Sequence, residues 1–499
     1  MINDDVFNQL YASGSQPGIM YGLPKVHKSD YPLRPILSAI GTHVYNLSKF
    51  LVPLLDHLAY GCKTVKDTFQ FVSEITDFEN ANSYTMASFD VTSLFTNIPL
   101  DETINIILDL LFTNENDKFH NFSKPQFKKL LDMAVKENIF LFNEELFTQT
   151  DGVAMGSPLG PTLANIFMSY YEDKWLSNCP NDFKPILYKR YVDDSFLLFK
   201  DESHIAKFQE YLNSQHPNIK FTVERENNGS LPFLDVNVSR ANNSFVTNVF
   251  RKKTFTGLGM NFESSIPIDY KRNIIVCLVM RAYNICSNYF KFTNELQFLR
   301  NYFLANGFPI SFIEKNIRIT LNRIFVKIER PSTVSRKILY LKVPFYGVHS
   351  YSLKRKLSQL FKKFYPQIQL RVILTNGNTM SNLFKFKDRL PKMLCSGIVY
   401  KYSCGDCNAT YVGKSQRHLK TRVSEHRGLS VRTGRPIAKP SFSNIRDHAW
   451  KADHRINEDN FEILTRSSIN SDLPILEALA IHEHRPSLNE YFHGLLSIF

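Results

Sequence analysis

The chain has 499 residues, of which 43% are hydrophobic and 13% aromatic, and its formal net charge is +13 at pH 7. This composition excludes a wholly disordered protein, and the length favours about two to four domains. Seven scattered cysteines and the lack of a recognisable signal peptide favour a reducing compartment. The longest purely apolar run, residues 274–280, is too short to span a bilayer, so we expect no membrane role.

Three zones follow one another along the chain. Residues 1–250 mix strand-like and helix-like segments, residues 251–390 are basic and mostly helical in period, and residues 391–499 form a small, separate α/β module. Within the second zone, residues 353–364 carry their leucines and phenylalanines on one helical face. A turn at 376–378 lies near the second junction. The predicted fold is an α+β multidomain protein.

In the first zone, three aspartates are expected to meet. A β-prone run over 83–91 delivers Asp90, and the apolar segments on either side of Asp193 and Asp194 predict two strands joined by a tight turn. Adjacent buried carboxylates repel each other unless a cation neutralises them, and Mg²⁺ prefers one or two carboxylates plus substrate phosphates. Three converging carboxylates suit two-metal phosphoryl transfer from a triphosphate to a primer 3′-hydroxyl. The alternative is a solvated acidic turn.

A glycine-rich loop over 152–161 lies between these aspartates and precedes a helix-like run over 162–171. Glycine lets a backbone come close to a template base or a nucleotide. A plain turn before a helix is the alternative interpretation.

Six segments of this zone resemble a reverse transcriptase. Residues 90–95, 156–161 (GSPLGP) and 191–194 (YVDD) resemble motifs A, B and C, in that order. Further matches are 33–36 (LRPI) with the fingers segment, 217–221 (PNIKF) with motif D and 231–235 (LPFLD) with the primer grip, motif E. The resemblance implies right-hand fingers and palm over 1–250. No acidic cluster resembling RNase H follows.

The resemblance assigns roles to individual residues of this zone. It implies that two Mg²⁺ ions are held at Asp90, Val91, Asp193 and Asp194, and that Lys220 is a candidate acid for the pyrophosphate. It places the nucleotide at Lys25, Arg34, Val91, Phe95 and Gly156, with Arg34 favoured over Lys25 because a guanidinium holds phosphate in a bidentate geometry. Phe95 stands where these enzymes have a steric gate against the ribose 2′-hydroxyl, which would favour dNTPs; a core residue is the alternative.

The second zone is strongly basic. Residues 251–392 contain 26 Lys/Arg against six Asp/Glu, interleaved with Phe and Tyr. This favours a nucleic-acid partner over a merely solvated face. After a reverse transcriptase palm, residues 251–390 fit a helical thumb that grips the template–primer backbone without reading sequence.

The third zone carries a second set of chemical groups. Two short β-prone segments, 397–400 (GIVY) and 411–414 (YVGK), precede a helix-like run that places Leu419, Val423 and His426 on one face. Phosphodiester hydrolysis needs a base for water, a cation for the phosphate and a carboxylate that holds a metal.

The ordered set resembles a GIY-YIG endonuclease. That resemblance implies that Tyr400 and Tyr411 lie at the cleavage centre with one acting as general base, that Arg422 and His426 flank the phosphate, and that Glu477 binds a single Mg²⁺. An extra residue before Tyr400 leaves the role of Gly397 open.

Four residues of this zone are predicted to form a structural Zn²⁺ site. Cys404 and Cys407 form a C-x-x-C pair between the two β-prone segments, and His448 and His454 form an H-x5-H partner. A redox pair is less favoured without a thioredoxin-like context. Cys395 and His426 are the alternative ligands.

The combination of this polymerase with this nuclease resembles the Penelope-like retroelements. The resemblance implies nuclear retrotransposition: the nuclease nicks genomic DNA, and the exposed 3′-hydroxyl primes copying of the element RNA from dNTPs. A telomerase-like enzyme that extends existing DNA ends and a catalytically silent nucleic-acid-binding protein are the alternatives. Because Met1 lies shortly before the fingers motif, the question whether an N-terminal RNA-binding region is missing stays open. The oligomeric state stays open.

Overall fold

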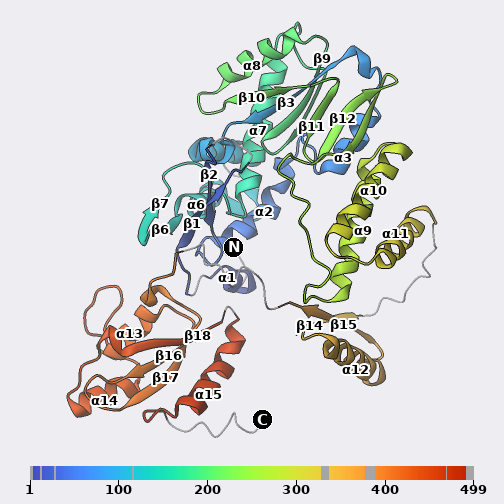
Figure 1. The fold of residues 1–499 in the computed structure, drawn as a ribbon. Helices are drawn as coiled ribbons and strands as arrows, with labels where there is room; N and C mark the ends of the chain where they lie inside the picture. Colours follow the sequence, from blue (N-terminus) through green and yellow to red (C-terminus); the bar gives the residue numbers. More distant parts are fainter. Residues whose placement is uncertain are drawn as a thin grey trace.

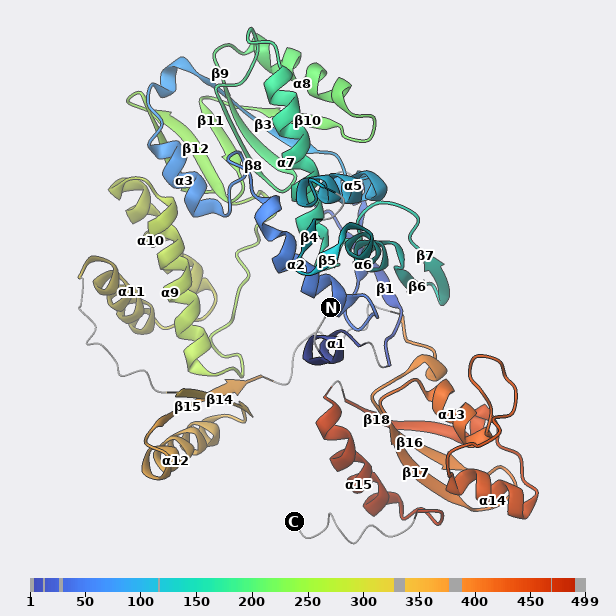
Figure 2. The ribbon, with the colours of Figure 1, turned by 180° about the vertical axis from the view of Figure 1, so that it is seen from behind.

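The structure is a computed structural model that describes residues 4–11, 14–26, 30–114, 117–326, 337–376, 388–467 and 469–489. Figure 1 shows the chain in sequence colours and Figure 2 shows it from behind. Two residues of the turn expected at 376–378, Gly377 and Asn378, lie outside the described residues. Among the described residues, no helix combines the length and the apolar character needed to cross a membrane.

The palm is built on an antiparallel sheet with strand order β10–β3–β9–β8. These strands are β3 (Thr85–Val91), β8 (Leu187–Tyr191), β9 (Asp194–Phe199) and β10 (Phe221–Arg225). Strand β9 is buried on both faces, because Leu197 and Phe199 enter one core while Phe196 and Leu198 enter another. Burial on both faces explains why this strand is a continuous apolar run in the sequence. Helices α7 (Gly160–Asn178) and α8 (Ser203–Gln215) contribute to the first core.

The fingers lie next to the palm and contain a sheet with order β2–β1–β6–β7. The strands are β1 (Gly18–Pro24), β2 (Leu33–Ser38), β6 (Ile139–Phe142) and β7 (Glu145–Thr148), and a small hairpin is formed by β4 (Lys118–Phe119) and β5 (Phe122–Ser123). The helices of residues 4–136 are α1 (Asp4–Leu10), α2 (Tyr45–Ala59), α3 (Thr68–Thr76), α4 (Leu94–Asn97), α5 (Leu100–Leu111) and α6 (Lys124–Lys136), with a 3-10 turn η1 (Ala81–Ser83).

The predicted thumb begins after a three-stranded sheet of β11 (Ser230–Phe233), β12 (Val236–Ala241) and β13 (Ser244–Val249). Helices α9 (Ile268–Ile285), α10 (Tyr289–Ala305) and α11 (Ile310–Phe325) share one core. Helices α9 and α10 contact β13, whereas α11 packs on α9 and α10. In both views α11 lies on the outer side of α9, away from α2 of the fingers (Figures 1 and 2).

The remainder of the basic zone departs in part from the expected mostly helical structure. Strands β14 (Lys337–Pro344) and β15 (Ile368–Thr375) pair in parallel, with α12 (Val348–Phe364) as their crossover. Helix α12 confirms the helix expected over 353–364, but its apolar face is only partly covered, since Phe364 is 63% exposed. Both strands were missed, because their apolar residues are interrupted by Lys and Arg, which we attributed to a basic helical surface.

The C-terminal module has a three-stranded antiparallel sheet with order β17–β16–β18. Its strands are β16 (Ile398–Ser403), β17 (Thr410–Ser415) and β18 (Phe461–Arg466), and its helices are α13 (Leu419–Arg427), α14 (Asn444–Ala452) and α15 (Leu473–His484). Short 3-10 turns are η3 (Lys392–Leu394), η4 (Glu458–Asn460) and η5 (Asn470–Asp472). The β-prone segments and the helix expected at 397–426 are confirmed, and Leu419, Val423 and His426 form the buried face of α13.

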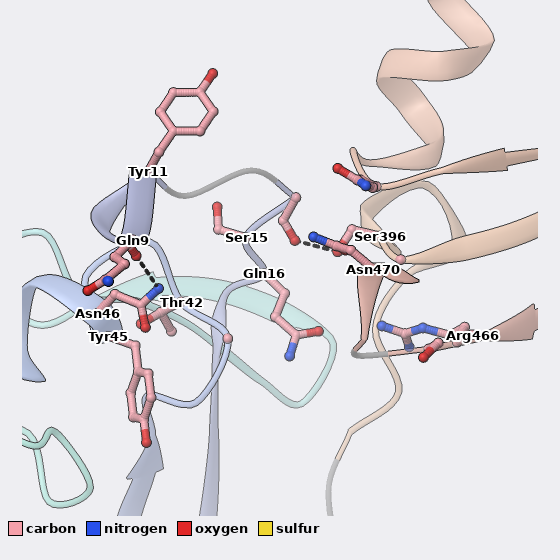
Figure 3. A pocket seen from close by; sticks show the side chains of 15 residues that line it. Gln9, Tyr11, Ser15, Gln16, Thr42, Tyr45, Asn46, Ser396, Arg466 and Asn470 are labelled. Atoms are coloured by element: carbon pink, nitrogen blue, oxygen red, sulfur yellow. Dashed lines mark hydrogen bonds between the residues drawn. The ribbon is translucent and has the colours of Figure 1, made fainter. Parts of the chain in front are cut away.

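The segment before β1 contacts the C-terminal module. Ser396 donates a hydrogen bond to the carbonyl oxygen of Gly14, and the imidazole of His418 is hydrogen-bonded to the carbonyl oxygen of Ser15. A polar cavity of about 710 Å³ lies beside this junction, with Gln16 on one side and Arg466 on the other (Figure 3).

Candidate active sites and metal centre

Strand pairing brings the three predicted metal-binding aspartates together. Asp90 stands opposite Asp194 in the β3–β9 ladder, and the N–H of Val91 donates to the carbonyl oxygen of Asp193 at 3.0 Å. The predicted hairpin is confirmed as β8 and β9, with Val192 at φ 56° in the turn. This left-handed conformation lets the chain reverse direction within a tight turn, which leaves Asp193 and Asp194 at the end of the sheet.

The electrostatics of this carboxylate cluster favour a cation. Burial, reinforced by the neighbouring charges of Asp193 and Asp90, raises the pKa of Asp194 to about 7. A carboxylate with so high a pKa is poorly compensated by the protein alone. The donor set is entirely oxygen, which fits Mg²⁺.

The glycine-rich loop is held between β2 and α4. Gly156 has φ +127°, and a Cβ on it would lie 2.3 Å from the carbonyl oxygen of Leu37 in β2. The N–H of Val153 donates to the carbonyl oxygen of Phe95 at 2.6 Å. Phe95 is half-buried and packs at the edge of the palm core, so it is neither a free surface ring nor a fully buried one. The loop thus connects Phe95, shortly after β3, to strand β2.

The C-terminal module brings the predicted nuclease residues together around Tyr400. The fully buried Tyr400 hydroxyl lies 2.8 Å from Nε2 of His426 and accepts a hydrogen bond from Nε of Arg422 at 3.1 Å. The rings of Tyr400 and Tyr411 have centroids 6.4 Å apart. Lys414 binds the carboxylate of Glu477 at 2.8 Å. Only Tyr411 of the two tyrosines is partly exposed.

Two glycines make room for this arrangement. A Cβ on Gly413 would lie 2.7 Å from the Tyr411 ring and 2.8 Å from the Tyr400 hydroxyl oxygen. Gly397 has φ +61°, and its Cβ would lie 2.4 Å from the carbonyl oxygen of Ser467. This close approach gives Gly397 a backbone role, which the sequence had left open.

Burial sets the charges at this second centre. It raises the pKa of both Tyr400 and Tyr411, so both phenols are protonated at rest. Burial lowers the pKa of His426 to about 3, helped by the positive charge of Arg422 and Arg446, and the imidazole is therefore neutral. Arg422 stays charged: burial opposes its charge, but Tyr400 and Glu425 raise its pKa.

The four predicted zinc ligands form a compact cluster. Their ligand atoms all lie within 4.8 Å of one another, with Cys404 Sγ 3.4 Å from His454 Nδ1 and Cys407 Sγ 3.5 Å from His448 Nε2. A tetrahedral Zn²⁺ with bonds of about 2.0–2.3 Å separates its ligand atoms by about 3.3–3.8 Å, so the cluster fits zinc. Although burial opposes it, hydrogen bonds from the backbone of residues 406 and 407 lower the pKa of the Cys404 thiol.

The alternative zinc ligands lie elsewhere. The thiol of Cys395 is directed to the carbonyl oxygen of Pro391 at 3.7 Å, and His426 is engaged with Tyr400. Neither belongs to the Cys/His cluster.

Comparison with protein families identifies the first zone. Residues 26–226 match the model described as "Reverse transcriptase (RNA-dependent DNA polymerase)". The chain contains a reverse transcriptase domain. Residues 259–318 match the "Animal helix-turn-helix domain", which the sequence analysis did not anticipate and which covers α9, α10 and half of α11. Neither match extends into residues 391–499. No curated protein matches the chain.

Among solved structures, the chain is similar to polymerases at low identity. Apo telomerase from Candida tropicalis, truncated from its C-terminal domain, is 15% identical over 48% of this chain and 56% of that one, with a TM-score of 0.36. Candida albicans telomerase in complex with a TWJ fragment of telomeric RNA is 12% identical over 66% of each chain, with a TM-score of 0.40. The Sicinivirus 3Dpol RNA-dependent RNA polymerase is 12% identical over 64% and 72%, with a TM-score of 0.39. The chain thus spans 56% and 66% of the two telomerase chains.

The basic residues predicted to bind the nucleotide or to act on the pyrophosphate lie at two places, one end of the β1–β2 hairpin and the segment before β10. Arg34 is exposed in β2 opposite Leu23, and Lys25 follows β1 at the same end of this hairpin. The backbone carbonyl oxygen of Lys220 accepts a hydrogen bond from the N–H of Thr92, just after β3, at 2.8 Å. The Lys220 ammonium, however, donates to carbonyl oxygens of residues 213 and 216 at the end of α8. To act as an acid for the pyrophosphate, the Lys220 ammonium must leave these two carbonyl oxygens.

Sequence reasoning missed a buried ion pair beneath the YVDD turn. Arg190 is fully buried and donates to Glu172 of α7 at 2.7 Å, to Asn165 at 2.8 Å and to the carbonyl oxygen of Val192 at 3.0 Å. The strand period could have revealed this pair. Tyr188 and Arg190 are two positions apart and therefore share the inward face of β8, where a charged residue needs a buried partner.

The segment predicted to be the primer grip is linked to the predicted thumb. Asp235 accepts a hydrogen bond from Thr68 of α3 at 2.8 Å and forms an ion pair with Arg281 of α9 at 2.7 Å. The end of motif E thereby joins palm and thumb.

Proposed function

We propose that the chain is an RNA-directed DNA polymerase that extends a DNA primer with dNTPs on an RNA template. The observation that carries this proposal is the meeting of Asp90, Asp193 and Asp194 at the end of the palm sheet of a reverse transcriptase domain. Bound Mg²⁺ would supply Lewis-acid activation of the primer hydroxyl and charge neutralisation at the leaving pyrophosphate. The carboxylates and the Val91 backbone would hold it.

The chain's own residues then position the nucleotide. Arg34 would contact the triphosphate from β2, and the Gly156 loop, which packs against Leu37 of this strand, would support the base. Phe95 would exclude a ribose 2′-hydroxyl. Its ring is half-buried and its carbonyl oxygen accepts a hydrogen bond from Val153, so the ring cannot easily move aside.

We further propose that the C-terminal module is a GIY-YIG endonuclease. Its support is the network in which the Tyr400 hydroxyl contacts both His426 and Arg422, while the Tyr411 ring and the charge of Glu477 lie close enough to act on Tyr400. Because Tyr411 is partly exposed and Tyr400 is fully buried, Tyr411 is the better placed to take a proton from water, once its own phenolic proton has passed to solvent. Glu477 would hold one Mg²⁺ after Lys414 releases it.

The outer face of α11 supports binding of duplex DNA. Ser311, Lys315, Arg318 and Asn322 are all exposed, and their spacing places them on one helical stripe. The preceding turn contains Gly307 at φ +79°, as expected of a short turn between such helices. Together with the helix-turn-helix match, this stripe favours target DNA as the partner of the thumb, beyond backbone grip alone.

The two activities suggest target-primed reverse transcription in the nucleus. The nuclease would expose a genomic 3′-hydroxyl, and the polymerase would copy the element RNA from it. Extension of DNA ends that already exist, as by a telomerase-like enzyme, is the alternative.

One experiment separates these possibilities. Purified protein is given supercoiled DNA, an RNA template, dNTPs and Mg²⁺, and cDNA joined to the DNA is sequenced. We expect Asp193→Asn to abolish synthesis while nicking continues, and Glu477→Gln to abolish nicking while extension of a supplied primer continues. Asp109→Asn and Glu483→Gln, which change exposed carboxylates, are the matched controls. Unchanged joining in Glu477→Gln favours telomerase-like extension, and no product from wild type refutes the polymerase proposal.

A further inference from the structure

His426 has a second partner that the nuclease motif does not include. Its Nδ1 lies 2.6 Å from Oγ of Ser443, while Nε2 lies 2.8 Å from the Tyr400 hydroxyl. Both His426 and Ser443 are buried, at 1% and 7% exposure. The imidazole is thus held at both nitrogens, in a site where water does not compete for either hydrogen bond.

The proton count along this chain favours one of the two neutral tautomers. The neutral imidazole has one N–H. The protonated Tyr400 phenol already accepts from Nε of Arg422, so its own hydrogen is available for Nε2 of His426. Nε2 is then the acceptor and Nδ1 carries the hydrogen, which it donates to Ser443 Oγ. Replacing the Ser443 hydroxyl would leave this buried N–H without its acceptor.

Ser443 also links His426 to the Cys/His cluster, because it stands at the start of the helix that carries part of that cluster. It is the N-cap of α14, where Oγ accepts from the N–H of Arg446 at 3.2 Å. Helix α14 carries His448, and His454 follows its C-terminal end. The nine-residue helix is therefore attached to the cleavage centre at one end and to the cluster at the other.

We propose that Ser443 is a positioning residue that keeps His426 in the Nδ1–H tautomer, with the unprotonated Nε2 facing Tyr400, and that the Cys/His cluster fixes Ser443 through α14. This inference rests on the proposed nuclease. In this tautomer the unprotonated Nε2 accepts the Tyr400 hydroxyl hydrogen bond and so holds the Tyr400 ring in place beside Tyr411. Metal at the cluster then affects cleavage through the orientation of one imidazole.

The decisive measurement is NMR of the full-length protein with ¹⁵N-labelled histidine, with the His426 signals identified by their loss in His426→Gln. Wild type should show the Nδ1–H tautomer. Ser443→Ala should shift His426 to Nε2–H or a mixture, and Ser443→Thr, which keeps the hydroxyl, should restore the wild-type pattern. Cys407→Ser should shift the same signals. An unchanged His426 tautomer in Ser443→Ala overturns the proposal.

Nicking kinetics provide the second readout. We expect Ser443→Ala to lower kcat about ten- to a hundredfold with little change in KM, because Ser443 is buried behind His426. Lys451→Ala is the control, since it removes an exposed ion pair to Asp447 on the same helix. A kcat loss in Lys451→Ala equal to that in Ser443→Ala overturns the positioning role. If the wild type does not nick DNA, the proposed nuclease fails, and the tautomer measurement still decides the role of Ser443.

Discussion

Replacing Arg190 by Met tests the buried ion pair beneath the YVDD turn. The side chains of Arg190 and Glu172 are 0% and 2% exposed, and the pair is joined at 2.7 Å. Without Arg190, the hydroxyl of Tyr188, at 2.6 Å, is the partner that Glu172 keeps among the described residues, and the carboxylate remains an uncompensated buried charge. Breaking such a pair from one side costs about 3–5 kcal/mol. We therefore expect Arg190→Met to destabilise the palm by this amount.

A second substitution isolates the charge effect from the loss of packing. Glu172→Gln keeps the shape and neutralises the carboxylate, so Arg190→Met combined with Glu172→Gln should be more stable than Arg190→Met alone. A coupling of about 2–3 kcal/mol between the two positions is expected from residues in direct contact. Lys124→Met, which breaks an exposed pair with Asp109, should cost about 1 kcal/mol or less.

The assay is native-state hydrogen exchange of the full-length chain, followed by mass spectrometry of peptides from α7, β8 and β9. These peptides report the opening free energy of the palm without interference from the other domains. Primer extension should slow as well, because the carbonyl oxygen of Val192 loses its donor in a turn at φ 56°. Wild-type protection in Arg190→Met, or equal loss in the single and double variants, refutes the reasoning.

Four further outcomes are expected. Because the pKa of Asp194 is raised to about 7 and Mg²⁺ needs the carboxylate, lowering the pH from 8 to 6 should weaken Mg²⁺ binding about tenfold by calorimetry, and a flat profile contradicts this. Gly156→Ala places a Cβ 2.3 Å from Leu37 O, so primer extension should be lost and the melting temperature should fall. Wild-type extension and an unchanged melting temperature in this variant would contradict the close approach of the loop to β2. Phe95→Ala should raise ribonucleotide use relative to dNTPs about tenfold in single-nucleotide assays, and unchanged selectivity assigns Phe95 to the core. Cys407→Ser should lower zinc content from about one ion per chain while extension of a supplied primer persists, and equal zinc content excludes this ligand set.

The secondary structure around both candidate centres was largely predictable, because it depends on short-range patterns. The β-prone run ending at Asp90 and the apolar segments around Asp193 and Asp194 became β3, β8 and β9. The helical face of Leu419, Val423 and His426 became the buried face of α13. Side-chain alternation with period 2 or 3.6 is set by backbone geometry within one element, so it is visible without any partner.

Parts of the basic zone were less predictable from charge. Helices α9 to α11 agree with the expected period, but β14 and β15 pair across a helix, and this parallel contact is not marked by any local turn. The helix-turn-helix match likewise depends on a pattern of core positions spread over three helices, which basic composition alone does not reveal.

The sequence by itself determined which residues could do chemistry here, since the order and spacing of Asp90, the Gly156 loop, YVDD, the tyrosines and Glu477 are properties of the chain. Only the tertiary structure decided what holds them. Arg190 meets Glu172, and His426 meets Ser443, across separations of 18 and 17 residues between different elements. Such contacts are chosen by the burial of polar groups that must be paired once water is excluded, and burial is a property of the folded whole.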